Sequence, residues 1–134
     1  MVGPPQIVDD FITSPAYSID ENATIQQSKS KMKELNTDFL VVTRDNSPVY
    51  VLREVETVFL KPTETIAKIA RQRKMDPVVV VKSGSLWAST IPRLRENTLL
   101  IVADTKTSPP QLLGAVSTYE MNWKAQRRQE HRSW

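Results

Sequence analysis

The sequence predicts an α/β (α+β) fold built from tandem β-α-β-β repeats that pack with pseudo-two-fold symmetry. Short apolar segments of strand length alternate with segments in which apolar residues recur at helical spacing. The order helix, strand, turn, strand occurs twice along the chain. A helix between two strands implies a parallel, right-handed connection, whereas a short turn implies an antiparallel hairpin. We therefore expect two similar units with a cleft where they meet.

The first repeat is expected over about residues 12–56. It begins with an extended segment, because Pro15 disfavours helical backbone at the residue before it. Acidic and hydroxyl side chains up to Thr24 are typical of a helix start and predict a helix over about 23–35. The rest of this repeat is a strand, a polar turn, a second strand, and a short polar turn or helix start: 39–43, 44–47, 48–52 and 53–56.

The second repeat is expected over about residues 57–121. Thr63 is a candidate N-cap for a helix over 64–74. The continuous apolar run 78–81 predicts a buried strand, paired as a hairpin with 86–90. An extra strand pair, within 99–117, repeats the hairpin without a full helix before it. We expect one domain over residues 7–123, with flexible termini at 1–6 and 124–134.

Composition argues against an enzyme. The 134 residues include no cysteine, which excludes disulfides, thiolate nucleophiles and cysteine metal sites. The only histidine is His131, so a Ser-His pair or a histidine metal centre lacks its oriented partners. The three glycines, Gly3, Gly84 and Gly114, are too far apart for a glycine-rich phosphate loop. The sequence thus predicts neither a catalytic residue nor a metal ligand.

The charge pattern argues against binding to nucleic acid or to a membrane. The formal net charge is +3, and residues 124–134 account for all of it, so the remaining chain is balanced. A nucleic-acid-binding domain should carry a basic face on its body. No apolar run approaches the roughly 18–20 residues that cross a bilayer, and the first residues lack the pattern of a signal peptide. We expect a cytoplasmic protein.

The layout resembles the cystathionine-β-synthase (CBS) domain, which normally occurs as a tandem pair. Residues 13–19 are similar to that family's entry strand, and residues 39–45 to its central strand. Residues 114–120 match its pattern of glycine, apolar residues, hydroxyl and acid. In the first repeat, Tyr50 stands where the glycine is usual and Arg53 where the hydroxyl is usual, with Glu56 as the acid. Trp87 is placed at the glycine position of the second repeat.

The resemblance implies a non-catalytic regulatory module that binds an adenosine-containing ligand such as AMP or ATP. In the family, the hydroxyl contacts phosphate and the acid holds the ribose hydroxyls, which points here to Ser117 and Glu120. It also implies a homodimer or a regulated partner protein. The full set of candidate ligand-binding residues is Gly114, Ser117, Thr118, Glu120, Tyr17, Glu56 and Lys61.

Simpler interpretations of the same residues stay open. Ser117, Thr118 and Glu120 are also the pattern of an ordinary helix N-cap with an acid in the first turn. Tyr17 is a candidate for stacking on a purine or for packing between strands. The alternative function is a protein–protein interaction or adaptor domain whose degenerate cleft binds no nucleotide.

Overall fold

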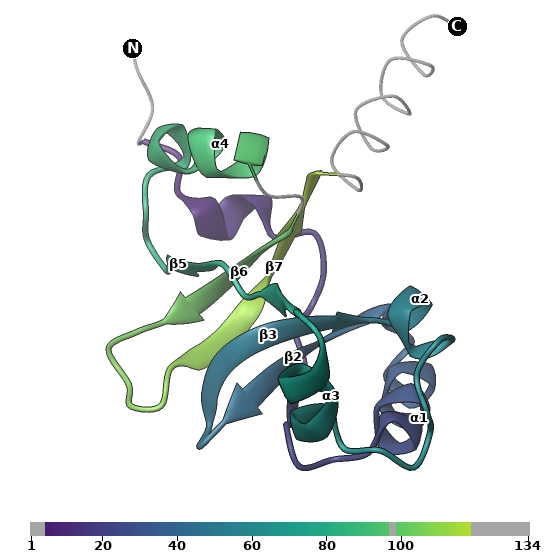
Figure 1. Cartoon of the computed structure of the whole chain (residues 1–134). Coiled ribbons are helices and arrows are strands. Elements are labelled where there is room, and N and C mark those ends of the chain that lie inside the picture. The colour runs from purple at the N-terminus through teal and green to yellow at the C-terminus, as the bar shows by residue number, and fades with distance from the viewer. Residues whose placement is uncertain (1–4, 97–98, 119–134) are drawn as a thin grey trace, which may run out of the picture. The chain divides into compact units, whose positions relative to one another are not determined.

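The computed structural model describes residues 5–96 and 99–118 (Figure 1). These residues divide into two compact units. One unit is the continuous segment 17–78. The other combines 5–16 with the described residues from 79 to 118. Each unit has a small sheet and its own buried core, which confirms the mixed α/β fold.

The unit 17–78 contains a four-stranded sheet in the order β1-β2-β3-β4. Strands β1 and β2 are parallel, and the β2–β3 and β3–β4 pairs are antiparallel. The core lies between the sheet and the helices, with Leu40, Leu52 and Ile66 fully buried. The elements are β1 (Ser18–Asp20), α1 (Ile25–Leu35), β2 (Phe39–Arg44), β3 (Ser47–Arg53), α2 (Glu54–Thr57), α3 (Ile66–Gln72) and β4 (Asp76–Pro77).

Helix α1 begins and ends where its sequence predicts. Thr24 Oγ1 accepts a hydrogen bond from the Gln27 N–H at 3.1 Å, and Gln27 Oε1 accepts from the Thr24 N–H at 2.8 Å. This reciprocal pair is a capping box, which satisfies two amides at the helix start. Asn36 ends the helix in the left-handed conformation with φ 52°, a geometry that asparagine tolerates better than most residues.

The second unit contains a three-stranded sheet in the order β5-β6-β7. Strands β5 and β6 are parallel, and β6 and β7 are antiparallel. Its core includes Val81, Leu100, Val102 and Val116. The elements are η1 (Val8–Phe11), β5 (Val80–Lys82), α4 (Trp87–Glu96), β6 (Leu99–Asp104) and β7 (Gln111–Ser117).

Residues 5–16 are an integral part of this second unit. Val8 is fully buried in its core. The Asp9 carboxylate accepts hydrogen bonds from Ser83 Oγ at 2.6 Å and from the Gly84 N–H at 2.7 Å. Burial raises the pKa of Asp9, but these hydrogen bonds outweigh burial and lower that pKa overall. The ring of Phe11 stacks on that of Trp87 with centroids 3.9 Å apart.

The predicted strand over 86–90 is wrong, because Trp87–Glu96 is helix α4. Trp87, Thr90 and Leu94 recur at helical spacing; Thr90 is buried, and Trp87 and Leu94 pack on the core. Pro92 lies inside this helix, where the sequence favours a break. The counterpart of α1 is therefore α4, not the helix predicted over 64–74. Trp87 is a helical residue and does not stand at a glycine position.

The two copies of the β-α-β-β pattern run from β1 to β3 and from β5 to β7. Their hairpins match in detail, since each shifts register at the same place, between Val42 and Thr43 and between Val102 and Ala103. Tyr50 pairs with Val42 as Gly114 pairs with Val102. Arg53 and Ser117 likewise pair with the first residues of β2 and β6. The structure confirms that Tyr50 and Arg53 stand where the other copy has Gly114 and Ser117.

A short edge segment completes each sheet: residues 12–14 lie beside β7, and β4 lies beside β3. In the sequence, each segment comes just before the first strand of the other unit. Ser14 forms an antiparallel bridge with Ala115 on β7. Asp76, in β4, pairs in the same way with Val51 on β3. Both residues are followed by proline. The predicted limits of the domain and its repeats stay predictions, and of the predicted flexible termini, residues 1–4 and 124–134 lie outside the described residues.

Candidate functional site

The end of β7 is joined to the edge segment by a dense set of hydrogen bonds. The Thr13 N–H donates to the Ala115 carbonyl at 2.9 Å, and the Ala115 N–H donates to the Ser14 carbonyl at 2.9 Å. Thr13 Oγ1 also donates to the Ala115 carbonyl at 3.2 Å and accepts from the Ser117 N–H at 3.1 Å. This arrangement holds the backbone of β7 up to its last residue, Ser117.

Gly114 is required by the packing of the edge segment. A Cβ at this position would lie 2.5 Å from Ile12 Cγ2 and 3.1 Å from the Ser14 carbonyl oxygen. The 2.5 Å contact is shorter than real Cβ contacts, so any larger residue would force Ile12 or the segment 12–14 to shift, and glycine avoids this. The space beside the Gly114 Cα is thus filled by Ile12, which gives the predicted ligand-binding glycine a structural reason.

Two hydroxyl residues stand where β7 ends. Ser117 is the last residue of the strand, and Thr118 follows it in helical conformation. Both residues are half-buried. Glu120, the predicted acid, lies outside the described residues. Of the candidate residues in this unit, the structure therefore brings Gly114, Ser117 and Thr118 together along one strand end.

The other three candidates lie in the unit 17–78. The Tyr17 side chain packs against the core of that unit, and its carbonyl accepts from the Val41 N–H at 2.8 Å. Glu56 Oε1 accepts from the Arg53 N–H at 3.1 Å, which makes Glu56 a capping residue of α2. Lys61 is exposed in the turn before α3. A ligand role for these three residues stays a prediction.

In the first copy of the pattern, larger side chains lie at the end of β3, where the second copy has Gly114 and Ser117 at the end of β7. Arg53, in the position of Ser117, has its Nε 4.0 Å from Asp76 Oδ2 on the neighbouring edge strand. Tyr50 places a half-buried aromatic ring where the second copy has no side chain. The guanidinium carbon of Arg44 lies 5.9 Å from the centroid of that ring. This end of β3 offers no hydroxyl pair to a ligand.

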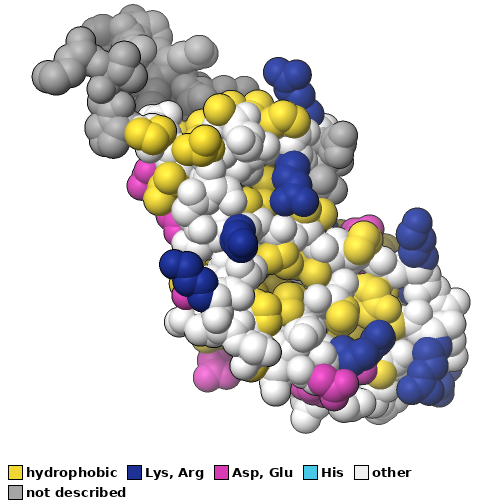
Figure 2. Space-filling model, turned by 90° about the vertical axis from the view of Figure 1, so that its left-hand side faces the viewer, with side chains coloured by type: hydrophobic (Ala, Val, Ile, Leu, Met, Phe, Trp, Pro, Cys, Tyr) yellow, Lys and Arg dark blue, Asp and Glu magenta, His cyan; other side chains and the backbone are white. Residues whose placement is uncertain are grey.

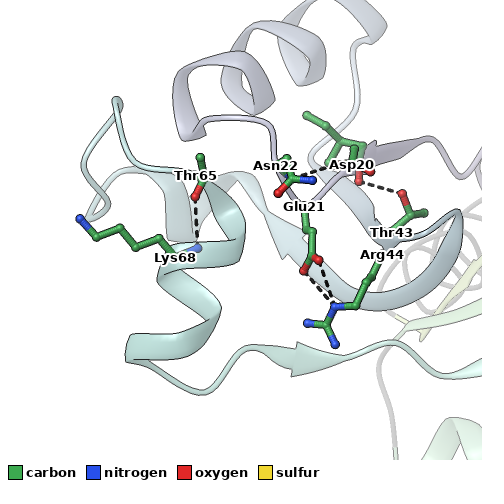
Figure 3. A network of polar contacts seen from close by, with 8 residues as sticks. Asp20, Glu21, Asn22, Thr43, Arg44, Thr65 and Lys68 are labelled. Carbon is green, nitrogen blue, oxygen red and sulfur yellow. Dashed lines mark hydrogen bonds and ion pairs between the residues drawn. The ribbon is translucent and has the colours of Figure 1, made fainter.

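A polar network in the same unit fixes the turns around β1 and β2 (Figure 3). Both carboxylate oxygens of Glu21 accept from Arg44 Nε, at 3.0 and 3.1 Å. The hydrogen bonds with Glu21 and Tyr50 raise the pKa of the Arg44 guanidinium above its usual range. Asp20 accepts from the Asn22 N–H, and Thr65 from the Lys68 N–H. These contacts cap turns and a helix, so the network has a structural role.

Sequence reasoning missed two residues at the end of β7. Thr13 contributes the hydroxyl that holds the Ser117 amide. The Ser14 side-chain oxygen is buried and has no hydrogen-bond partner among the described residues. The signal in the sequence is the repeated dipeptide of a polar residue and proline, Ser14-Pro15 and Asp76-Pro77. That repetition becomes informative only once both segments are known to be edge strands.

The described residues were also compared with the features of metal sites, membrane-spanning helices and basic surfaces. They contain no group of three or more His, Cys, Asp or Glu side chains that could hold a metal ion. None of the described helices has the length and apolar character needed to cross a membrane. Lys and Arg side chains are scattered over the face in Figure 2 and do not gather there into one basic patch.

No family model and no curated protein matches the sequence of this chain. Solved structures do match its fold. The CBS domains of a transcriptional regulator from Streptococcus pneumoniae align at a TM-score of 0.62 and 18% identity, over 84% of this chain and 92% of that one. The chain has the fold of a CBS domain pair. A hemolysin-like protein from Oenococcus oeni, which contains a CBS domain, aligns at 0.65 and 15% identity over 87% and 88% of the two chains.

A third structure that matches in fold is the cytosolic domain of the Mg²⁺ channel MgtE, solved in complex with ATP. It aligns at a TM-score of 0.64 with 18% identity over 83% of this chain. This chain spans 45% of the length of that domain. At such identities the likeness establishes the fold alone.

Proposed function

We propose that this chain is a non-catalytic regulatory module that binds an adenosine-containing nucleotide at the end of β7. The observation that carries the proposal is the hydroxyl pair Ser117 and Thr118 at the end of a strand held in place by Thr13. The CBS-pair fold supports it, because a relative in fold was solved with ATP. The phosphates would accept hydrogen bonds from the two hydroxyls, and Glu120 would hold the ribose.

The same reasoning gives one nucleotide per chain. The equivalent strand end of the first copy carries the Arg53–Asp76 ion pair and the Tyr50 ring in place of the glycine and the hydroxyl. A nucleotide there would have to displace both groups. Ligand binding at β7 would act by linkage, since a ligand that prefers one arrangement of the module shifts the population towards it. The arrangement would be transmitted to a cytoplasmic partner protein or to a second copy of the chain.

Calorimetric titration with AMP, ATP and S-adenosylmethionine, with GTP as the base control, tests the proposal. We expect one adenosine ligand per chain and, at about 100 times Kd, a stabilisation of about 2.7 kcal/mol in a thermal shift assay. Thr118→Val should weaken binding about tenfold, as for loss of one hydrogen bond to a charged group. Thr107→Val, in the loop between β6 and β7, is the matched control. Absence of heat and of thermal shift with every ligand at millimolar concentration would refute nucleotide binding.

A separate observation favours the alternative, a protein-interaction module. Val55, Val58 and Phe59 are 65, 69 and 82% exposed, and they lie within five consecutive residues of α2 and the turn after it. Such clustering of large exposed apolar side chains is typical of contact surfaces. We expect Phe59→Ser to reduce self-association in sedimentation equilibrium while leaving the urea unfolding midpoint of the chain unchanged. A chain that is monomeric with Phe59 intact would contradict a homodimer through this surface.

A further inference from the structure

We infer that Thr13 is a positioning residue for the proposed nucleotide site, because its hydroxyl holds the Ser117 amide at the end of β7. The inference rests on the proposed function and deepens it, since it names the residue that fixes the strand end proposed to bind. It follows from three features of the described residues: one hydroxyl with two partners, its absence in the first copy, and the group that replaces it there.

The hydroxyl of Thr13 uses both of its hydrogen-bonding capacities on β7. It donates to the Ala115 carbonyl at 3.2 Å and accepts from the Ser117 N–H at 3.1 Å. The acceptor role matters most, because Ser117 is the last residue of the strand and its N–H, like that of Ala115, bonds to the edge segment. A backbone amide at a half-buried strand end needs a partner. Thr13 supplies that partner from the edge segment.

The first copy shows that the fold does not require this hydroxyl. The residue before Asp76-Pro77 is Met75, as Thr13 is the residue before Ser14-Pro15. Met75 is 6% exposed and packs in the core of its unit. Asp76 still pairs with Val51 in the same register as Ser14 with Ala115. The edge segment is therefore held by its backbone in both units, and the hydroxyl has a different task.

The equivalent amide in the first copy shows what that task is. The Arg53 N–H donates to Glu56 Oε1 at 3.1 Å, so the acid three residues further on is used as a cap. In the second copy, the acceptor for the Ser117 amide is the Thr13 hydroxyl, which comes from the edge segment. Thr13 therefore fixes the backbone beside the Ser117 hydroxyl, which the proposed function assigns to the phosphates.

The test compares Thr13→Val with Thr13→Ser in the full chain. Valine has the shape of threonine without its hydroxyl, and serine keeps the hydroxyl. Two quantities are measured: amide hydrogen exchange at Ser117 by NMR, and the Kd for ATP by calorimetry. We expect Thr13→Val to raise Ser117 exchange and to weaken ATP binding, each about tenfold, as loss of one hydrogen bond implies. Thr13→Ser should restore both to within about threefold of the natural chain.

Asp9→Asn is the matched control, since it loosens the same segment at another place. Asp9 binds Ser83 and Gly84, so exchange should rise at the Gly84 amide but not at Ser117. Its ATP affinity should stay within about twofold of the natural chain.

Unchanged exchange at Ser117 in Thr13→Val would overturn the inference. Raised exchange with natural ATP affinity would overturn it as well, because Thr13 would then be structural only. If the natural chain binds ATP and Thr13→Val binds it with the same affinity, the inference about Thr13 is refuted but the proposed function is not. A natural chain that binds no adenosine nucleotide refutes the proposed function and, with it, this role of Thr13.

Discussion

Replacing Gly114 by alanine is the sharpest test of how the edge segment packs on β7. The new Cβ would lie 2.5 Å from Ile12 Cγ2, 3.1 Å from Ile12 Cδ1 and 3.1 Å from the Ser14 carbonyl oxygen. The Ile12 side chain can change rotamer, but the Ser14 carbonyl is backbone and accepts the Ala115 N–H. Relief of the contact therefore has to move the paired segment. We expect a loss of about 1–3 kcal/mol in the free energy of unfolding, the usual range for overpacking a core.

Urea unfolding of Gly114→Ala, Ile12→Ala and the double variant measures this effect. Removing the Ile12 side chain takes away two of the three short contacts, so the double variant should be less destabilised than the sum of the single variants by about 0.5–1.5 kcal/mol. Gly84→Ala is the control in open space, since no atom lies within 4 Å of its Cβ and only its φ of 83° is strained. A stability of Gly114→Ala within about 0.5 kcal/mol of the natural chain, or strict additivity in the cycle, would refute the packing argument.

Three further predictions follow from contacts described above. The pKa of Asp9 is lowered in the folded chain, so its carboxylate stabilises the fold above the ordinary aspartate pKa of about 3.9, and this contribution is lost as the pH falls through the folded value. Between pH 6 and pH 3 the free energy of unfolding should therefore fall more steeply for the natural chain than for Asp9→Asn. Parallel pH dependences would contradict this. Thr24→Ala removes the cap that binds the Gln27 amide, so urea unfolding should show a loss of about 1 kcal/mol, whereas an unchanged midpoint would show that water replaces the cap. Titration of Ser117→Ala with ATP should show the single binding event weakened about tenfold, as for loss of one hydrogen bond to a charged group, and no second event at Arg53. Natural ATP affinity in this variant would place the nucleotide elsewhere.

The sequence predicts local structure well where one short segment contains the whole signal. The β2–β3 hairpin is an example, because an apolar run is followed by Asp45 and Asn46, residue types that tolerate left-handed backbone. Both do have positive φ, 51° and 65°. Helix α4 was missed because a five-residue window around Trp87 resembles a strand and because Pro92 suggests a break. Its apolar stripe extends to Leu94, beyond that window.

The candidate site could be predicted only where its residues lie in one short segment. Ser117 and Thr118 stand out because the acid, the glycine and the hydroxyls lie within seven consecutive residues. Thr13 could not be found in this way, since its partners are on a strand far along the chain and no local pattern marks them. The resemblance to the CBS family makes Glu56 a candidate ligand residue, as the acid three residues after Arg53. The same spacing is that of a capping box, and the structure shows Glu56 bound to the Arg53 amide.

The pairing of residues 5–16 with β7 has a consequence for the order of events during synthesis. Thr13 and Ala115 are separated by 102 positions, which a ribosome covers in about 5–20 s at the usual rate of elongation. The segment 17–78 is complete long before that and contains all the strands of its sheet. Val8 and Ile12, by contrast, are made before every strand of the sheet on which they pack, and the core that they complete includes Val116 of β7. Nascent chains halted shortly before β7 should therefore expose these apolar side chains, which makes them natural points of contact for a chaperone at the exit tunnel.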